Sequence, residues 1–320
     1  MSDVILHHYA ISPFAEKIRV ILGYKGLAWR SVDIPMVMPK PDLTALTGGY
    51  RKTPVLQIGC DVYCDTALIS RVLDALQPEP PVHRPEQGAL AVPAGRWLDH
   101  HFFFAVIALL FDPSVMKSGI ATLGGPEGAA AFMKDRGQML AAARVRPPSL
   151  PDANVVFEDV LGRLDAQLAA RGPFLFGDAP GWADFCAYHP LWMASDNAAF
   201  APRLAGYRHV GAWLERIRGF GHGEPKPLGS GEALAVARGS TPRPLDGPAG
   251  PPLDGIALGD EVEIAADDYA FEPSAGRLVH VGPDELAIER TDDRAGRVVV
   301  HFPRIHYTVK TRKVRPRSTL

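Results

Sequence analysis

The sequence of 320 residues predicts an α/β domain, an all-helical domain and a small all-β barrel, in that order. Strand and helix patterns alternate over the first eighty residues, only helical patterns follow up to about residue 220, and five short β-prone runs follow residue 260. A chain of this length can bury separate hydrophobic cores. We expect the domains at residues 1–79, 84–222 and 255–320, with a Pro- and Gly-rich linker at 223–254.

The first domain is predicted to begin with a strand at Val4–His8 and a helix at Pro13–Tyr24. A second strand is expected at 29–34, and a Pro-rich connection then leads to a β-hairpin at 53–63. A helix begins at Thr66, where apolar residues recur on one face. This order is a βαβ unit followed by a hairpin and a helix.

Amphipathic stripes predict the helices of the second domain at 90–111, 127–143 and 183–194. Two further stripes are centred on Leu161 and Trp213. The longest apolar run is too short to span a bilayer, so it indicates a buried helix.

The segment from residue 225 to residue 252 holds seven prolines and five glycines, and we expect at most a short helix at 232–238. The β-prone runs that follow are separated by Asp, Gly and Pro turns and predict a small closed or half-closed barrel. These runs are 262–265, 276–281, 286–290, 297–302 and 307–310.

The net charge of −2 gives no general attraction to nucleic acid or to an acidic membrane, so we expect neither as a partner. Cys60, Cys64 and Cys186 do not form a disulfide framework, and no secretion signal opens the chain, so a cytoplasmic location is expected. A basic run near the C-terminus is interpreted as a solvated tail, because the barrel segment balances it with acidic residues. Its members are Lys310, Arg312, Lys313, Arg315 and Arg317.

The turn before the first helix carries a hydroxyl with two possible roles. Ser12 is a good N-cap, and Pro13 suits the first helical position. Alternatively, the free N–H groups, the helix dipole and the hydroxyl together stabilise an anion such as a thiolate.

Four segments resemble the cytosolic glutathione transferases, over about residues 3–220. Residues 12–19 (Ser-Pro-Phe-Ala-Glu-Lys-Ile-Arg) resemble the opening of that family's first helix, and residues 52–56 (Lys-Thr-Pro-Val-Leu) resemble the segment that carries its cis-proline. Asp65-Thr66 resembles its acid-hydroxyl pair, and residues 176–184 resemble the turn before its buried helix. The resemblance implies a thioredoxin-like domain, an all-α transferase domain and a homodimer. A fused SH3-like barrel is not usual for the family.

The resemblance also implies glutathione as co-substrate. Ser12 takes the position that contacts the glutathione sulfur, and Lys52 takes the position that meets the glycyl carboxylate. Pro54 would follow a cis bond, and the Val55 backbone would pair with the tripeptide as a strand does. The remaining contacts, to the γ-glutamyl ammonium and carboxylate, come from Asp65 and Thr66.

The motif around Ser12 resembles the omega-type branch, whose usual residue there is cysteine. Serine cannot form a mixed disulfide, so the residue predicts a hydrogen bond to the glutathione thiolate. Tyr9 is the alternative hydroxyl donor, as in other branches. The pocket for the electrophilic co-substrate is expected to include Tyr9, Phe14 and Phe104.

These features predict a glutathione transferase that adds the thiolate to a small electrophile. Glutathione-dependent isomerisation would use the same site. The alternative to an enzyme is a non-catalytic protein with the same fold that binds a protein partner through its barrel. No metal is expected, because Asp99, His100 and His101 are adjacent on a helix and diverge by about 100° each.

Overall fold

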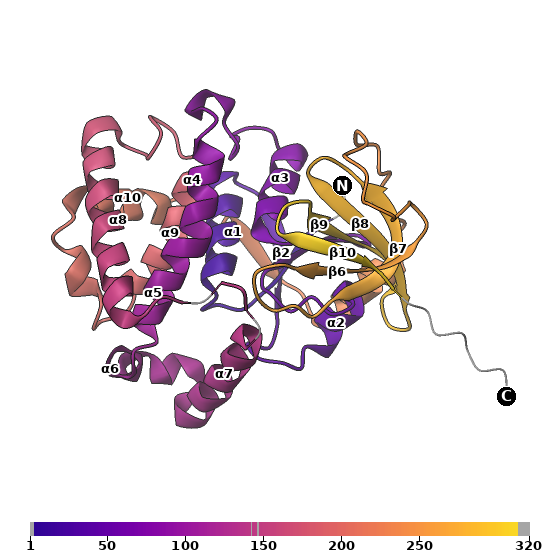
Figure 1. Ribbon diagram of the computed structural model, residues 1–320, viewed down its shortest axis with the longest axis horizontal. Helices are drawn as coiled ribbons and strands as arrows, with labels where there is room; N and C mark the ends of the chain where they lie inside the picture. The colour runs from indigo at the N-terminus through magenta and orange to yellow at the C-terminus, as the bar shows by residue number, and fades with distance from the viewer. Residues whose placement is uncertain (1–2, 142, 146, 313–320) are drawn as a thin grey trace.

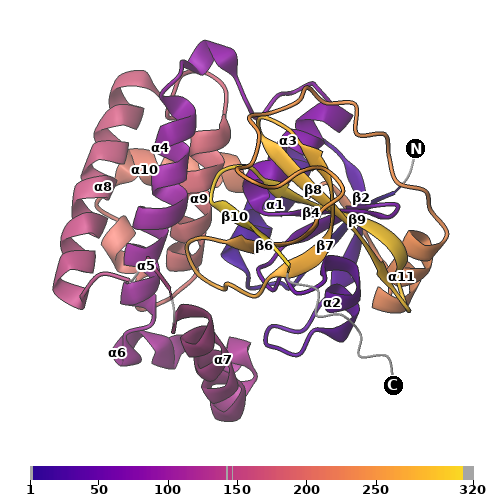
Figure 2. The same cartoon turned by 45° about the vertical axis from the view of Figure 1, so that its right-hand side comes forward.

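The computed structural model describes residues 3–141, 143–145 and 147–312. Figures 1 and 2 show the helical domain on one side of the first domain and the C-terminal strands on the other. The basic residues Lys313, Arg315 and Arg317 lie outside the described residues.

The first domain has the predicted thioredoxin-like order. Strand β1 pairs in parallel with β2 and antiparallel with β3, and β3 pairs antiparallel with β4. Helix α2 was not predicted, because two prolines precede it; it begins at Pro41 and buries Leu43 and Leu46. The elements are β1 (Val4–His8), α1 (Pro13–Tyr24), β2 (Ala28–Asp33), α2 (Pro41–Thr47), β3 (Val55–Ile58), β4 (Asp61–Cys64) and α3 (Thr66–Leu76).

The helical domain confirms the predicted stripes. The expected helix at 90–111 is divided by a π-helical turn at Leu98–Phe102. Short 3-10 helices occur at Pro85–Gln87, Lys117–Leu123 and Ala201–Leu204. The α-helices are α4 (Ala91–Trp97), α5 (Phe103–Leu110), α6 (Pro113–Met116), α7 (Gly125–Leu140), α8 (Leu150–Arg171), α9 (Trp182–Ser195) and α10 (Arg208–Arg218).

The C-terminal region contains the five predicted strands, all paired antiparallel among themselves. Of these five strands, the last (β10) pairs with the first (β6), which gives the order β10-β6-β7-β8-β9. These strands are β6 (Glu261–Ala266), β7 (Ser274–Val281), β8 (Glu285–Asp292), β9 (Gly296–Pro303) and β10 (Tyr307–Thr311).

The C-terminal strands continue the sheet of the first domain. Strand β9 pairs in parallel with β4, with Val300 opposite Val62, so that ten strands form one sheet. Without β9, strand β4 would expose unpaired backbone groups and buried apolar side chains at a sheet edge. Val62, Val298 and Val300 belong to one buried cluster. The expectation of a barrel tethered by a linker is therefore wrong, because the region is docked on the first domain.

The expected linker at 223–254 also contains folded elements. Strand β5 (Glu224–Pro227) pairs in parallel with β2. Helix α11 (Ser230–Arg238) buries Ala233, Leu234 and Ala237 in the cluster that the sheet and α2 share. The short helix expected at 232–238 is therefore present, but strand β5 and the burial of α11 against the sheet were not predicted, so residues 224–238 are not a linker.

Replacement of Leu234 by alanine tests whether α11 belongs to the core. The buried leucine predicts a loss of about 2–5 kcal/mol in the free energy of unfolding, measured by urea denaturation. Leu258, which is 64% exposed, supplies the matched control. Leu258→Ala is expected to change the free energy by less than about 0.5 kcal/mol. Equal effects of the two substitutions would show that α11 is not anchored.

The junction between β4 and β9 predicts a pH-dependent stability. His301 is buried, and its ring bonds to Asp61 Oδ1 at 3.1 Å and to a Glu285 oxygen. Burial alone would lower the pKa of His301, but these two carboxylates raise it above the ordinary value. The folded protein therefore binds the proton more tightly than the unfolded chain. The stability that protonated His301 contributes is complete below the pKa of the histidine in the unfolded chain. It is lost as the pH rises through the pKa of His301 in the folded protein.

His301→Gln should accordingly lower the free energy of unfolding most below pH 6.5, the ordinary pKa. The difference from the wild type should shrink as pH rises. The exposed His101, which stacks on Trp97 away from the junction, supplies the control His101→Gln. A difference that grows with pH would contradict the assigned protonation of His301.

Candidate functional site

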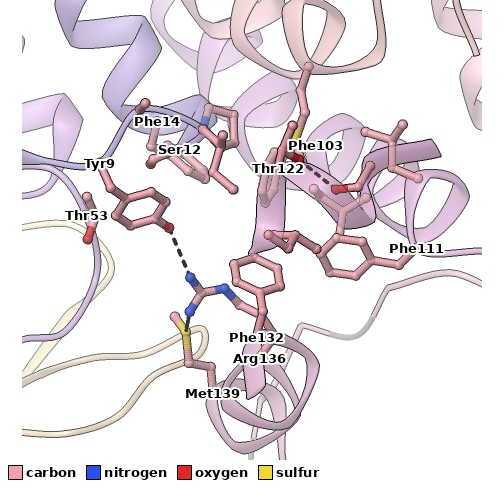
Figure 3. A pocket seen from close by; sticks show the side chains of 18 of the residues that line it. Tyr9, Ser12, Phe14, Thr53, Phe103, Phe111, Thr122, Phe132, Arg136 and Met139 are labelled. Atoms are coloured by element: carbon pink, nitrogen blue, oxygen red, sulfur yellow. Dashed lines mark hydrogen bonds between the residues drawn. The ribbon is translucent and has the colours of Figure 1, made fainter. Parts of the chain in front are cut away.

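A cavity of about 590 Å³ lies between the first domain and the helical domain. Figure 3 shows Tyr9, Ser12 and Phe14 on one side of it, with Phe103, Phe132 and Arg136 facing them from the helices. The C-terminal region also reaches the cavity through Tyr269. The site is therefore built from all three parts of the chain.

Ser12 caps α1 and faces the cavity at the same time. Its Oγ accepts a hydrogen bond from Ala15 N at 3.2 Å, and its own N–H donates to Tyr9 O. The side chain lines the cavity although the residue is only 3% exposed. The bond from Ala15 uses an acceptor lone pair, so the hydroxyl proton is left to donate. Capping and donation to a ligand are thus compatible.

Arg19 fixes the turn that carries Ser12. This buried guanidinium donates to Ala10 O at 2.7 Å and to Tyr9 O at 3.3 Å. It also forms an ion pair with Glu16 at 2.8 Å. The Arg19 guanidinium therefore fixes two carbonyls of the turn, and this contact orients the N-terminus of α1 toward the cavity.

Tyr9 lines the same cavity, but its hydroxyl is directed to α7. Arg136 Nη2 donates to the Tyr9 phenol oxygen at 3.0 Å (Figure 3). The same nitrogen donates to Met36 O at 2.9 Å. The two hydroxyls that the sequence left as alternatives therefore differ in environment. Ser12 lies at a helix N-terminus, and Tyr9 lies beside a guanidinium.

Lys40 is a cavity residue that the sequence analysis missed. It is 4% exposed, and its ammonium donates to Thr53 Oγ1 at 3.1 Å. Burial, together with nearby Arg136 and Arg51, lowers the pKa of Lys40 to about 8. Within the part of the chain that the structure describes, no carboxylate oxygen lies within 4 Å of this ammonium. A buried cation that faces a cavity in this way suits an anionic ligand.

Lys52 lines the cavity, but its ammonium is already paired with a carboxylate of the same chain. Its Nζ lies 2.6 Å from Asp268 Oδ1 and 3.9 Å from the centre of the Tyr269 ring. Both partners lie in the turn between β6 and β7. Glu272 from the same turn pairs with Arg51 at 2.6 Å. The sequence carried no local signal for these contacts, because more than two hundred residues separate the partners.

Asp65 lies outside the large cavity. It accepts from Ala67 N at 2.9 Å as the N-cap of α3, and Tyr307 Oη donates to its other oxygen at 3.1 Å. It lines a second, smaller cavity of about 50 Å³ together with His100 and His306. The two ends of the predicted tripeptide site thus open into different cavities.

The remaining predicted glutathione contacts are Pro54, Val55 and Thr66. The peptide bond between Thr53 and Pro54 is cis, as the resemblance implies. Val55 begins β3, with β1 and β4 on either side, and Thr66 begins α3. All three side chains are buried, and none of them lines either cavity.

Aromatic side chains form the apolar end of the large cavity. Phe14 and Phe103 are 4.7 Å apart between ring centres, and Phe104 meets Tyr269 edge to face at 5.5 Å. The structure therefore brings the predicted co-substrate residues Tyr9, Phe14 and Phe104 together.

Asp99, His100 and His101 diverge as expected. Asp99 pairs with Lys17 at 2.6 Å and with His189 at 2.9 Å, whereas the His101 ring stacks on Trp97. No cluster of three or more potential ligands for a metal occurs among the described residues. Burial raises the pKa of Cys60 to about 11 and raises the pKa values of Cys64 and Cys186, so these are structural thiols.

None of the helices in residues 3–312, apart from the undescribed positions 142 and 146, is both long and apolar enough to cross a membrane.

Two segments of this chain match models of known protein families. Residues 6–81 match the model of the glutathione S-transferase N-terminal domain, and residues 147–216 match that of the C-terminal domain. A search of curated proteins gave no match.

Solved structures extend the comparison to the whole chain. A GST-like protein from Pseudomonas syringae is 40% identical, with a TM-score of 0.81, and the alignment covers 98% of this chain and 100% of that one. FzlA from C. crescentus is 22% identical, with 68% and 88% coverage and a TM-score of 0.50. Glutathione S-transferase III in its apo form is 22% identical, with 76% and 100% coverage and a TM-score of 0.51.

The last two structures share the fold, whereas the Pseudomonas protein also matches through the C-terminal strands. From its two domain matches and this full-length relative, the chain belongs to the glutathione S-transferase family.

Proposed function

We propose that this protein binds glutathione in the large cavity and adds the glutathione thiolate to a small electrophile. The observation that carries the proposal is the position of Ser12, at a helix N-terminus in a cavity that basic and apolar side chains line. A thiolate needs hydrogen-bond donors, a peptide carboxylate needs a cation, and an organic electrophile needs apolar walls. The cavity offers all three.

In the proposed reaction, the Ser12 hydroxyl donates to the sulfur, and the N-terminus of α1 adds its dipole. Both favour the thiolate, so the thiol proton leaves to solvent. The sulfur lone pair then forms a bond to an electrophilic carbon, and the displaced electron pair leaves with a departing group or is delocalised in the acceptor. Catalysis consists of proximity and a preformed anion site.

The rest of the tripeptide would lie along the first domain. Lys52 would meet the glycyl carboxylate, as would Lys40, which lines the same cavity. The Val55 backbone pairs with β1 on one side and with β4 on the other, so the strand-like pairing with the tripeptide is not retained. Asp65 and Thr66 would hold the γ-glutamyl end. We also propose that the protein acts in the cytoplasm as a homodimer.

The electrophile would lie against the apolar end, between Tyr9, Phe14 and Phe104. This end is lined mainly by aromatic and aliphatic side chains, which favours a small apolar or aromatic compound. Glutathione-dependent isomerisation of such a compound would use the same groups.

A second candidate is a non-catalytic member of the family that binds a protein partner. One observation favours it: side chains of the C-terminal region already bond to Lys52 and Asp65. In this case the C-terminal strands would carry the partner surface, and glutathione would not bind.

Replacement of Ser12 tests the proposed mechanism. Ser12→Ala should lower kcat/KM for conjugation of a chlorodinitrobenzene by about a hundredfold, the scale for one lost donor to a developing anion. Ser12→Thr keeps a hydroxyl and a helix cap and should retain most of the activity. Thermal unfolding of each variant controls for the lost cap.

Tyr9→Phe separates the two hydroxyls. If Ser12→Ala leaves conjugation unchanged while Tyr9→Phe removes it, Tyr9 activates the thiol, and the mechanism proposed for Ser12 is wrong. If calorimetry detects no binding of glutathione to the wild type, the protein is not a transferase, and the non-catalytic candidate stands.

A further inference from the structure

The turn between β6 and β7 separates the two cavities that the glutathione tripeptide would have to join. Lys52 lines the large cavity, and His100 lines the small one together with Asp65. Asp268 lies between them, with one oxygen 2.6 Å from Lys52 Nζ and the other 3.8 Å from His100 Nδ1. A ligand that extends from Ser12 to Asp65 therefore meets the Asp268 side chain on its way.

The backbone of the turn that carries this carboxylate is held in position by the helical domain. Arg144 N donates to Asp268 O at 2.8 Å, and Ala270 N donates to Met139 O at 3.1 Å. The next residue, Tyr269, lies beneath the Lys52 ammonium and against Phe104. Asp268 is only 5% exposed, so little water weakens its attraction to Lys52. The turn reaches from the strands toward α5 and α7 in Figures 1 and 2.

The pairing changes what Lys52 can offer a ligand. A cation that already holds a carboxylate at 2.6 Å has little net charge left for a second one. Arg51 is likewise neutralised, by Asp135 at 2.5 Å and by Glu272. A peptide carboxylate at Lys52 therefore competes with Asp268 for the ammonium.

We propose that Asp268 competes with the glycyl carboxylate of glutathione for Lys52, so that the C-terminal strands set the affinity and the ligand preference of the glutathione site. The proposal rests on the function proposed above. Because Asp268 belongs to the same chain and is held by its turn, it competes at a high effective concentration. The wild-type site should consequently gain little from a free carboxylate at the glycyl end of its ligand.

Asp268→Asn tests the competition, because asparagine keeps the shape of the side chain and removes its charge. The ligands are glutathione and its monoethyl ester at the glycyl carboxylate, with dissociation constants from calorimetry on the full-length protein. The variant should bind glutathione about tenfold more tightly than the wild type does, the scale of one hydrogen bond between charged groups. Binding of the ester should change little.

Two further variants control the experiment. Glu272→Gln removes a negative charge from the same turn, but Glu272 pairs with Arg51 and not with Lys52. This variant should leave the ratio of the two dissociation constants near its wild-type value. Lys52→Met in the Asp268→Asn background should cancel the tenfold gain, because the two side chains act on one interaction.

The outcomes separate the two proposals. The competition is supported if Asp268→Asn tightens the binding of glutathione more than that of its ester, and if this gain is lost when Lys52 is also replaced. Equal tightening or equal weakening of both ligands would show a merely structural role and would overturn it, while glutathione binding to the wild type would still support the proposed function. Absence of binding to every variant would overturn the proposed function and, with it, the competition.

Discussion

The parallel pairing of β9 with β4 is the constraint on which the site depends. It covers an edge that the first domain would otherwise expose, and it fixes the C-terminal strands relative to β3 and α3. Two consequences reach the candidate site. The turn after β6 places Asp268 on Lys52, and the start of β10 places Tyr307 on Asp65. A region that follows the two transferase domains thus contributes groups to the site between them.

Buried charges hold the other side of the site. Lys17 of α1 is fully buried and pairs with Asp99 of the helical domain, which also accepts from His189. Burial raises the pKa of Asp99, but Lys17 and His189 hold it far below the usual range. Loss of one partner would leave an uncompensated buried charge, so the pair fixes α1 against the helical domain. The position of Ser12 follows from the position of this helix.

Local patterns predicted the order of most elements, with α2 and β5 as exceptions. Apolar periodicity identified α1, α3, α8 and α10, and alternating β-prone runs identified the five C-terminal strands. Ser12, Lys52, Tyr9, Phe14 and Phe104 were also predicted, and the structure brings them to one cavity. These residues lie in short motifs whose order along the chain carries information.

Contacts between distant segments could not be predicted in this way. The register of β9 against β4 joins residues more than two hundred positions apart, and no local pattern specifies it. A short helix was expected at 232–238, but not the burial of α11 in the core, because Pro and Gly surround its short apolar stripe. Lys40 belongs to a Pro-rich connection in the sequence, and only the fold shows that it is buried beside the cavity. Asp268 could not be identified either, because an acidic residue between two strands is ordinarily exposed to solvent.

A crystal structure of the full-length protein with glutathione tests the roles of Ser12 and Lys52 most directly. We predict the sulfur within hydrogen-bond distance of Ser12 Oγ, the glycyl carboxylate on Lys52, and Asp268 moved away from the lysine. A complex in which Asp268 stays on Lys52 while the sulfur lies beside the Tyr9 hydroxyl would contradict both roles.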